Sequence, residues 1–283
     1  MNTQTKEQIK ADLANYVLKI GGQSAASRQL SNISNGTISN ILAGKWQNIS
    51  DSMWLSLQKQ VKQAEWIHVD TRVSSKLYSI YADAKANQEV RGAIAKSGRG
   101  KTHTAKRFVE ENDNAFLVCC DQLMKINDFL GEIKRAVDLT KGGLNPFETL
   151  NYIADELMKL ENPIIIFDEF DKLKNVVKFL FISLYNRTEG KVSFFIQGAP
   201  FLKTSLEKLA KNDKIGAAET ISRLNGKIID LGDNTESQLH SIALINGLTD
   251  EERRIYTVND AAFDLRRLKS QVKVELRKER RVA

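Results

Sequence analysis

A glycine-rich loop at residues 95–102, Ala-Lys-Ser-Gly-Arg-Gly-Lys-Thr, most constrains what this chain can fold into. An apolar run at 90–94 precedes the loop, and a helical pattern at 105–108 follows it. A strand, a glycine turn and a helix in this order place the turn at the carboxyl edge of a parallel sheet. We therefore expect an α/β fold around this loop.

The rest of the chain extends this prediction. Apolar runs separated by helical stretches lie at 90–95, 115–120, 163–167, 192–197 and 227–231. Strands that alternate with helices form a parallel sheet covered by helices on both faces. We expect this α/β core at 89–233, preceded by a connecting helix or linker at 67–88. A small all-α lid is expected at 234–283, ending in a basic helix.

The loop has the composition of a phosphate-binding P-loop, with Ala95 where the usual motif has glycine. Its glycines let backbone N–H groups turn towards a phosphate, and Lys101 adds a mobile positive charge. The Thr102 hydroxyl is suited to ligate Mg²⁺. The predicted nucleotide-binding residues are Ala95, Ser97, Gly98, Arg99, Gly100, Lys101, Thr102 and His103.

Two adjacent carboxylates, Asp168 and Glu169, follow the apolar run 164–167. A buried parallel strand ends at the sheet edge where ligands bind. We therefore predict that Asp168 joins Thr102 in holding Mg²⁺ and that Glu169 polarises the attacking water. An ordinary turn at a strand end is the alternative. Together with the loop, the carboxylates predict an ATPase with ATP and Mg²⁺ as cofactors.

The order of these motifs resembles that of AAA+ ATPases. Residues 194–200, Phe-Phe-Ile-Gln-Gly-Ala-Pro, look like the sensor-1 strand of that family, which implies that Gln197 touches the γ-phosphate. Residues 221–224, Ile-Ser-Arg-Leu, resemble the segment that carries the arginine finger. The resemblance implies a catalytic role for Arg223 at a neighbouring subunit's nucleotide, and thus an oligomer. An arginine that extends from a helix into solvent is the alternative.

Residues 264–268, Asp-Leu-Arg-Arg-Leu, resemble the sensor-2 motif of the AAA+ lid. Phe263 stands before them, where a glycine is common in the family. The resemblance implies that Arg266 or Arg267 contacts the bound nucleotide.

Residues 1–66 read as short helices that include a helix-turn-helix. Within 22–44, the small residues Ala25 and Ala26 allow two helices to cross closely, and a polar turn separates the helices. This segment resembles the lambda-repressor-like DNA-binding domains. The expected DNA contacts are Arg28, Asn35, Thr37, Ser39, Asn40 and Lys45. A helical domain that binds protein rather than DNA is the alternative.

The charge of the chain permits a nucleic-acid partner. The formal net charge is +7, and eight of the basic residues lie between Arg266 and Arg281. Lys125 and Lys141 are further candidates for DNA contact by position, and solvated surface lysines are the alternative. The chain has no apolar run of membrane-spanning length, and its first residues lack the apolar core of a signal peptide. We expect a cytoplasmic protein of a bacterial host, phage or mobile element, without a membrane partner.

The combination of helix-turn-helix, small AAA+ core and short basic lid resembles transposition ATPases of the Mu-type protein B and Tn7-type groups. The resemblance implies ATP-bound subunits that self-associate as a ring or helical filament on double-stranded DNA. They would select the target and activate a cognate transposase, and hydrolysis would drive disassembly. A helicase loader or replication initiator is the first alternative. An ATP-gated helix-turn-helix transcriptional regulator is the second.

Overall fold

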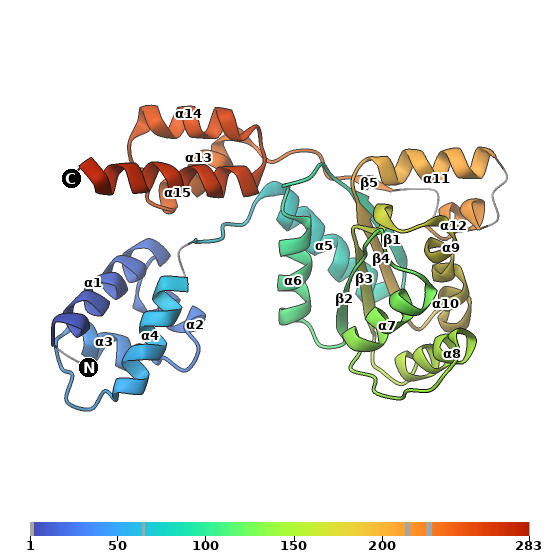
Figure 1. Ribbon diagram of the computed structural model, residues 1–283, viewed down its shortest axis with the longest axis horizontal. Coiled ribbons are helices and arrows are strands. Elements are labelled where there is room, and N and C mark those ends of the chain that lie inside the picture. The colour runs from blue at the N-terminus through green and yellow to red at the C-terminus, as the bar shows by residue number, and fades with distance from the viewer. Residues whose placement is uncertain (1–2, 64–65, 213–215, 225–227, 283) are drawn as a thin grey trace. The chain divides into compact units, whose positions relative to one another are not determined.

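The computed structural model describes residues 3–63, 66–212, 216–224 and 228–282 (Figure 1). Packing divides the chain into two units. The first comprises residues 1–69, 236–262 and 266–283, and the second comprises residues 70–235 and 263–265. No described helix is both long and apolar enough to cross a bilayer.

The N-terminal part of the first unit is helical. Its helices are α1 (Thr3–Ile20), α2 (Gln23–Gln29), α3 (Asn35–Leu42) and α4 (Asp51–Gln63). Ile9, Leu13, Ile38 and Trp54 are fully buried in one shared core. α3 begins at Asn35, directly after Ser34, whose hydroxyl caps the helix by accepting a hydrogen bond from the Thr37 N–H at 3.1 Å.

The C-terminal part of the first unit contains α13 (Glu236–Ile245), α14 (Glu251–Ala261) and α15, which runs from Leu265 to Val282. Asp250 caps α14 by accepting from the Arg253 N–H at 2.9 Å. The side chain of Asn246 is hydrogen-bonded to both backbone groups of Ile67, so the segment before residue 70 is tied to this helical group.

The second unit is built on a five-stranded sheet in which all paired strands are parallel, with the order β2-β3-β4-β1-β5 (Figure 1). Its strands are β1 (Val90–Ile94), β2 (Ala115–Cys119), β3 (Ile164–Asp168), β4 (Ser193–Gly198) and β5 (Ile229–Asp230). The predicted parallel sheet flanked by helices is therefore confirmed. The expected run 227–231 begins at Lys227, which lies outside the described residues.

Helices cover both faces of this sheet. α5 (Arg72–Asn87) and α6 (Lys101–Glu111) pack on one face, and α7 (Ile126–Ala136), α8 (Pro146–Leu157) and α10 (Leu180–Thr188) pack on the other. In β3, Ile164 and Ile166 contact the α5–α6 layer, whereas Ile165 and Phe167 contact the opposite layer. Because strand side chains alternate, Asp168 and Gln197 lie on the α5–α6 side.

Short elements complete the second unit. They are η1 (Phe170–Lys172), α9 (Asn175–Lys178), α11 (Phe201–Lys211) and α12 (Ala217–Arg223).

The segment expected as a connecting helix or linker forms a layer of the second unit. α5 begins at a capping box between Thr71 and Ser74, and it buries Val73, Leu77 and Tyr81 completely. Full burial of a large side chain contributes about 1.5–3 kcal/mol, so these residues fix the helix on the sheet. The boundary between the units falls at residues 69/70, before α5.

Candidate nucleotide site

The glycine-rich loop joins β1 to α6 and curls around its own lysine. Gly98 and Gly100 have φ angles of 74° and 97°, a left-handed conformation that glycine adopts without a Cβ clash. Lys101 Nζ donates to the carbonyl oxygens of Ala95 at 2.6 Å and Lys96 at 3.1 Å. The backbone N–H groups in the first turn of α6 and the lysine together suit an anion such as phosphate.

Ala95 occupies the position where the usual motif has glycine. Its side chain is 1% exposed and packs in the core between the sheet and the α5–α6 layer. Its N–H donates to Gly198 O at 3.3 Å, which ties the start of the loop to the end of β4. The methyl group thus points into the core, which explains why alanine is accommodated here.

An ion pair fixes the middle of the loop. Arg99 is buried, and its Nε donates to Asp233 Oδ1 at 2.6 Å while Nη1 donates to Ser97 O at 3.1 Å. The hydrogen bond from Arg99 lowers the pKa of Asp233 below its ordinary value. Sequence reasoning missed Asp233, which follows Gly232 just beyond β5, the strand beside β1.

The two predicted magnesium ligands lie together. Thr102 Oγ1 donates to Asp168 Oδ2 at 2.5 Å, and Asp168 is 1% exposed at the end of β3. Mg²⁺ prefers oxygen ligands and is commonly held by one or two protein groups, with waters and substrate phosphates completing its shell. The hydroxyl and carboxylate fit that donor set. Thr102 and Asp168 would hold the ion, which supplies positive charge to the phosphates.

Glu169 follows in a left-handed conformation, with φ 56°. Its N–H donates to Asp168 Oδ1 at 2.9 Å, and its own carboxylate pairs with Lys172 at 2.5 Å. This contact raises the pKa of Lys172. The Glu169 carboxylate is 38% exposed. It stands next to the magnesium pair but is held by Lys172 in this conformation.

Gln197 is fully buried in β4 and is directed at Asp168. Its Nε2 donates to Asp168 Oδ1 at 2.8 Å, and its Oε1 accepts from the Tyr81 hydroxyl. Burial raises the pKa of Tyr81 well above its ordinary value. The residue expected to touch the γ-phosphate thus contacts the carboxylate that is predicted to hold magnesium. Sequence reasoning assigned Tyr81 no role in the site, because it lies in the segment expected as a connecting helix or linker.

Arg223 lies at the end of α12, against α10. Its guanidinium lies 4.8 Å from the ring centroid of Tyr185, and it donates to Asn186 Oδ1 at 3.2 Å. The carboxylates of Glu189 and Glu219 lie 3.5 and 3.7 Å away. Within the second unit, Arg223 is thus held by groups of its own chain.

The segment at the start of the sensor-2-like motif touches the loop. Leu265 N–H donates to Gly98 O at 2.9 Å, and a methyl group on Gly98 would lie 2.2 Å from Asp264 Cγ. Phe263 adopts φ 65°, which is consistent with the glycine common at that position. The two candidate arginines, 266 and 267, are exposed in the first unit. Arg267 pairs there with Asp260 at 2.8 Å.

The N-terminal DNA candidates lie on α2 and α3 or just after α3. All are exposed except Thr37, which is partly buried and hydrogen-bonded to Ser34. The exposed residues are Arg28, Asn35, Ser39, Asn40 and Lys45. Of the basic residues in α15, the side chains of Arg280 and Arg281 lie outside the described part of the structure.

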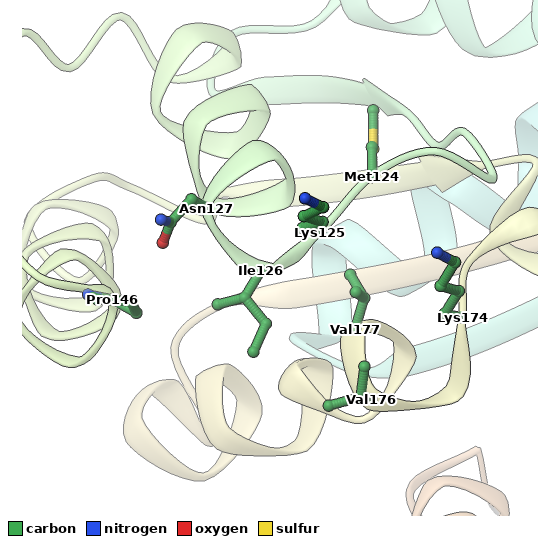
Figure 2. Close-up of a pocket in the computed structure, with 8 residues that line it drawn as sticks. All are labelled: Met124, Lys125, Ile126, Asn127, Pro146, Lys174, Val176 and Val177. Carbon is green, nitrogen blue, oxygen red and sulfur yellow. The ribbon is translucent and has the colours of Figure 1, made fainter.

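Lys125 and Lys141 belong to the second unit, and both are exposed. Lys125 and Lys174 both line a pocket of about 370 Å³. Figure 2 shows its lining side chains. The other lining residues are Met124, Ile126, Asn127, Pro146, Val176 and Val177. The Lys141 ammonium lies 5.4 Å from the ring centroid of Tyr152.

Comparison with known families identifies the core. Residues 92–206 match the family described as AAA domain. Over this stretch, the second unit is similar to AAA domains. This AAA domain match spans the P-loop, the Asp168–Glu169 pair and Gln197, and it ends within α11. Arg223, the sensor-2-like segment and the N-terminal helices lie outside it. A comparison with curated proteins found no match to the chain.

Proposed function

We propose that this protein is an ATPase whose ATP-bound form assembles on duplex DNA and whose hydrolysis step releases the DNA. The observation that carries the proposal is the contact between Thr102 and Asp168 beside the Lys101 loop, inside an AAA domain. In the reaction, Lys101 and the loop amides would bind the phosphates, and Thr102 and Asp168 would hold Mg²⁺. Glu169 leaves Lys172 and polarises the attacking water.

The N-terminal helices support the DNA part of the proposal. α3 presents short polar side chains to solvent and contains no arginine or lysine. Sequence-specific contacts in the major groove commonly use arginine or lysine on guanine. Arg28 and Lys45 flank the polar face and are suited to phosphates. This composition favours contact that is largely independent of DNA sequence.

The position of Arg223 supports self-association. An arginine finger stabilises negative charge on a nucleotide held by a neighbouring subunit. Arg223 is partly exposed, and its partners Glu189 and Glu219 are themselves solvent-accessible. Such pairs contribute little free energy, so the side chain can exchange them for a neighbour's γ-phosphate at small cost. We place the assembly in DNA transposition, with a transposase as the partner that stimulates hydrolysis.

The test is electron microscopy of the full-length protein with plasmid DNA and either ATP, a slowly hydrolysed analogue or ADP. We expect rings or filaments on DNA of arbitrary sequence with the analogue, and their loss with ADP. Lys101→Ala is the control, because it removes the phosphate-binding charge and should abolish assembly.

Absence of any nucleotide-dependent assembly on DNA would overturn the proposal. A footprint confined to one operator sequence would instead support a transcriptional regulator. Stable capture of a replicative helicase would support a loader.

A further inference from the structure

We propose that Tyr81 is a positioning residue for the magnesium carboxylate Asp168 and acts on it through the amide of Gln197. The inference deepens the proposed ATPase function and rests on it. The three side chains come from α5, β4 and β3, and Thr102 joins them from α6. One continuous hydrogen-bond chain therefore connects the helix that begins the second unit to the nucleotide loop.

The chemistry of the groups fixes the direction of this chain. An ionised carboxylate only accepts hydrogen bonds, so the NH₂ end of Gln197 must face Asp168. The amide oxygen then faces Tyr81, whose hydroxyl must donate. Because burial raises the Tyr81 pKa well above its ordinary value, the phenol keeps the proton that it donates. Loss of the Tyr81 hydroxyl would leave a buried amide oxygen without its donor.

The result of this chain is a fixed orientation of the Asp168 carboxylate. Oδ1 accepts from Gln197 Nε2 at 2.8 Å and from the Glu169 N–H at 2.9 Å. Oδ2 accepts from Thr102 and therefore faces the P-loop. Groups that orient a metal ligand in this way commonly change metal affinity when they are removed.

Packing holds the Tyr81 ring in place. The ring lies edge-on to Phe195, with 4.5 Å between the centroids, and is tilted against Phe108 at 5.1 Å. Tyr81 is fully buried, so its hydroxyl cannot exchange Gln197 for bulk water without local opening. The hydroxyl is thus a fixed donor and not a surface group that meets Gln197 by chance.

Tyr81→Phe isolates this role because it removes only the hydroxyl. Tyr78→Phe is the matched control: Tyr78 lies on the same helix, its ring packs on Phe108 at 5.0 Å, and its hydroxyl bonds to the exposed Glu111. The readout is the affinity for a fluorescent ATP analogue, first in EDTA and then over a Mg²⁺ titration. Mn²⁺ binding followed by electron paramagnetic resonance gives a second readout that needs no turnover.

For Tyr81→Phe we expect the half-saturating Mg²⁺ and Mn²⁺ concentrations to rise about 3- to 10-fold, the effect of one lost hydrogen bond. The metal-free nucleotide affinity should stay within about 2-fold of wild type. Tyr78→Phe should change neither. Gln197→Met removes the direct donor to Asp168, and it should shift the metal titration at least as far. This second variant keeps the inference testable if Tyr81→Phe is poorly folded.

An unchanged metal titration in folded Tyr81→Phe would overturn the inference while leaving the ATPase intact, and so would an unchanged titration in Gln197→Met. An equal shift in Tyr78→Phe would also overturn it, because the effect would then be general packing. Failure of the wild-type chain to bind ATP with Mg²⁺ would instead overturn the proposed function, and the inference with it.

Discussion

A methyl group at Gly98 tests the contact between the P-loop and residues 263–265. It would lie 2.2 Å from Asp264 Cγ and Oδ1, and the φ angle of 74° is unfavourable for alanine. The left-handed backbone costs about 1–2 kcal/mol for a residue with a Cβ. Displacement of Asp264 would also break the hydrogen bond between Leu265 N–H and Gly98 O, worth about 1 kcal/mol. Gly98→Ala should therefore destabilise the second unit by about 2–3 kcal/mol.

Gly100→Ala is the matched control. Its φ is 97°, but its added methyl would meet only Leu265 Cδ1 at 3.6 Å, an ordinary contact. Gly100→Ala should incur the backbone cost alone. Its free energy of unfolding should therefore fall by about 1 kcal/mol less than that of Gly98→Ala. Combining Gly98→Ala with Asp264→Ala should recover part of the loss, because the second change removes the three carboxyl atoms that clash.

The assay must report on the second unit. The tryptophans Trp46, Trp54 and Trp66 all lie in the first unit, so their fluorescence follows the wrong part of the chain. Hydrogen exchange at amides of the second unit, including the Leu265 amide, measured over a urea series follows the right part. Equal destabilisation by Gly98→Ala and Gly100→Ala, with full protection of Leu265 in both, would refute this reasoning.

Three further predictions follow from the ion pairs. Asp233→Asn should lower the free energy of unfolding by about 1 kcal/mol at pH 7. This value is small because the Asp233 carboxylate is partly exposed to solvent. Because Arg99 lowers the Asp233 pKa, the stabilisation is present above the ordinary value of about 3.9 and is lost as pH falls through the folded pKa. In urea unfolding, the difference in free energy of unfolding between wild type and Asp233→Asn should thus shrink only below about pH 4. A difference that stays constant with pH would contradict this. Lys172→Ala should raise the rate of basal phosphate release by at most about 5-fold, because it frees Glu169 from an exposed ion pair worth up to about 1 kcal/mol. Slower release would contradict this prediction. Arg223→Ala should cut hydrolysis in the assembled state about 10³-fold without weakening ATP binding, and an unchanged rate would exclude a finger role.

The sheet and the main loop were predictable because their signals are local. The run 164–167 is apolar throughout, as a strand buried on both faces requires, and the carboxylates follow it directly. The glycines at 98 and 100 do adopt the positive φ angles that their loop demands. Strand alternation then places Asp168 on the α6 side of the sheet, and Thr102 lies in the first turn of α6.

The contacts of Tyr81 and Asp233 were not predictable in the same way. Tyr81 and Gln197 are 116 positions apart in the sequence. They are in contact because α5 packs on the face of the sheet to which the Gln197 side chain points. Asp233 reaches Arg99 because β5 lies next to β1, an order that apolar runs do not reveal. For Arg223, a motif identified a candidate role, but not the aromatic and acidic groups that hold it.

The most direct test of the account compares ATP retention and hydrolysis in wild type and Glu169→Gln. The substitution keeps the size of the side chain and removes the base beside the magnesium pair. We predict that Glu169→Gln retains ATP and Mg²⁺ with wild-type affinity, while its single-turnover hydrolysis rate falls about 10²–10⁴-fold. A near-normal rate, or loss of ATP binding in this variant, would contradict the role of this site in hydrolysis.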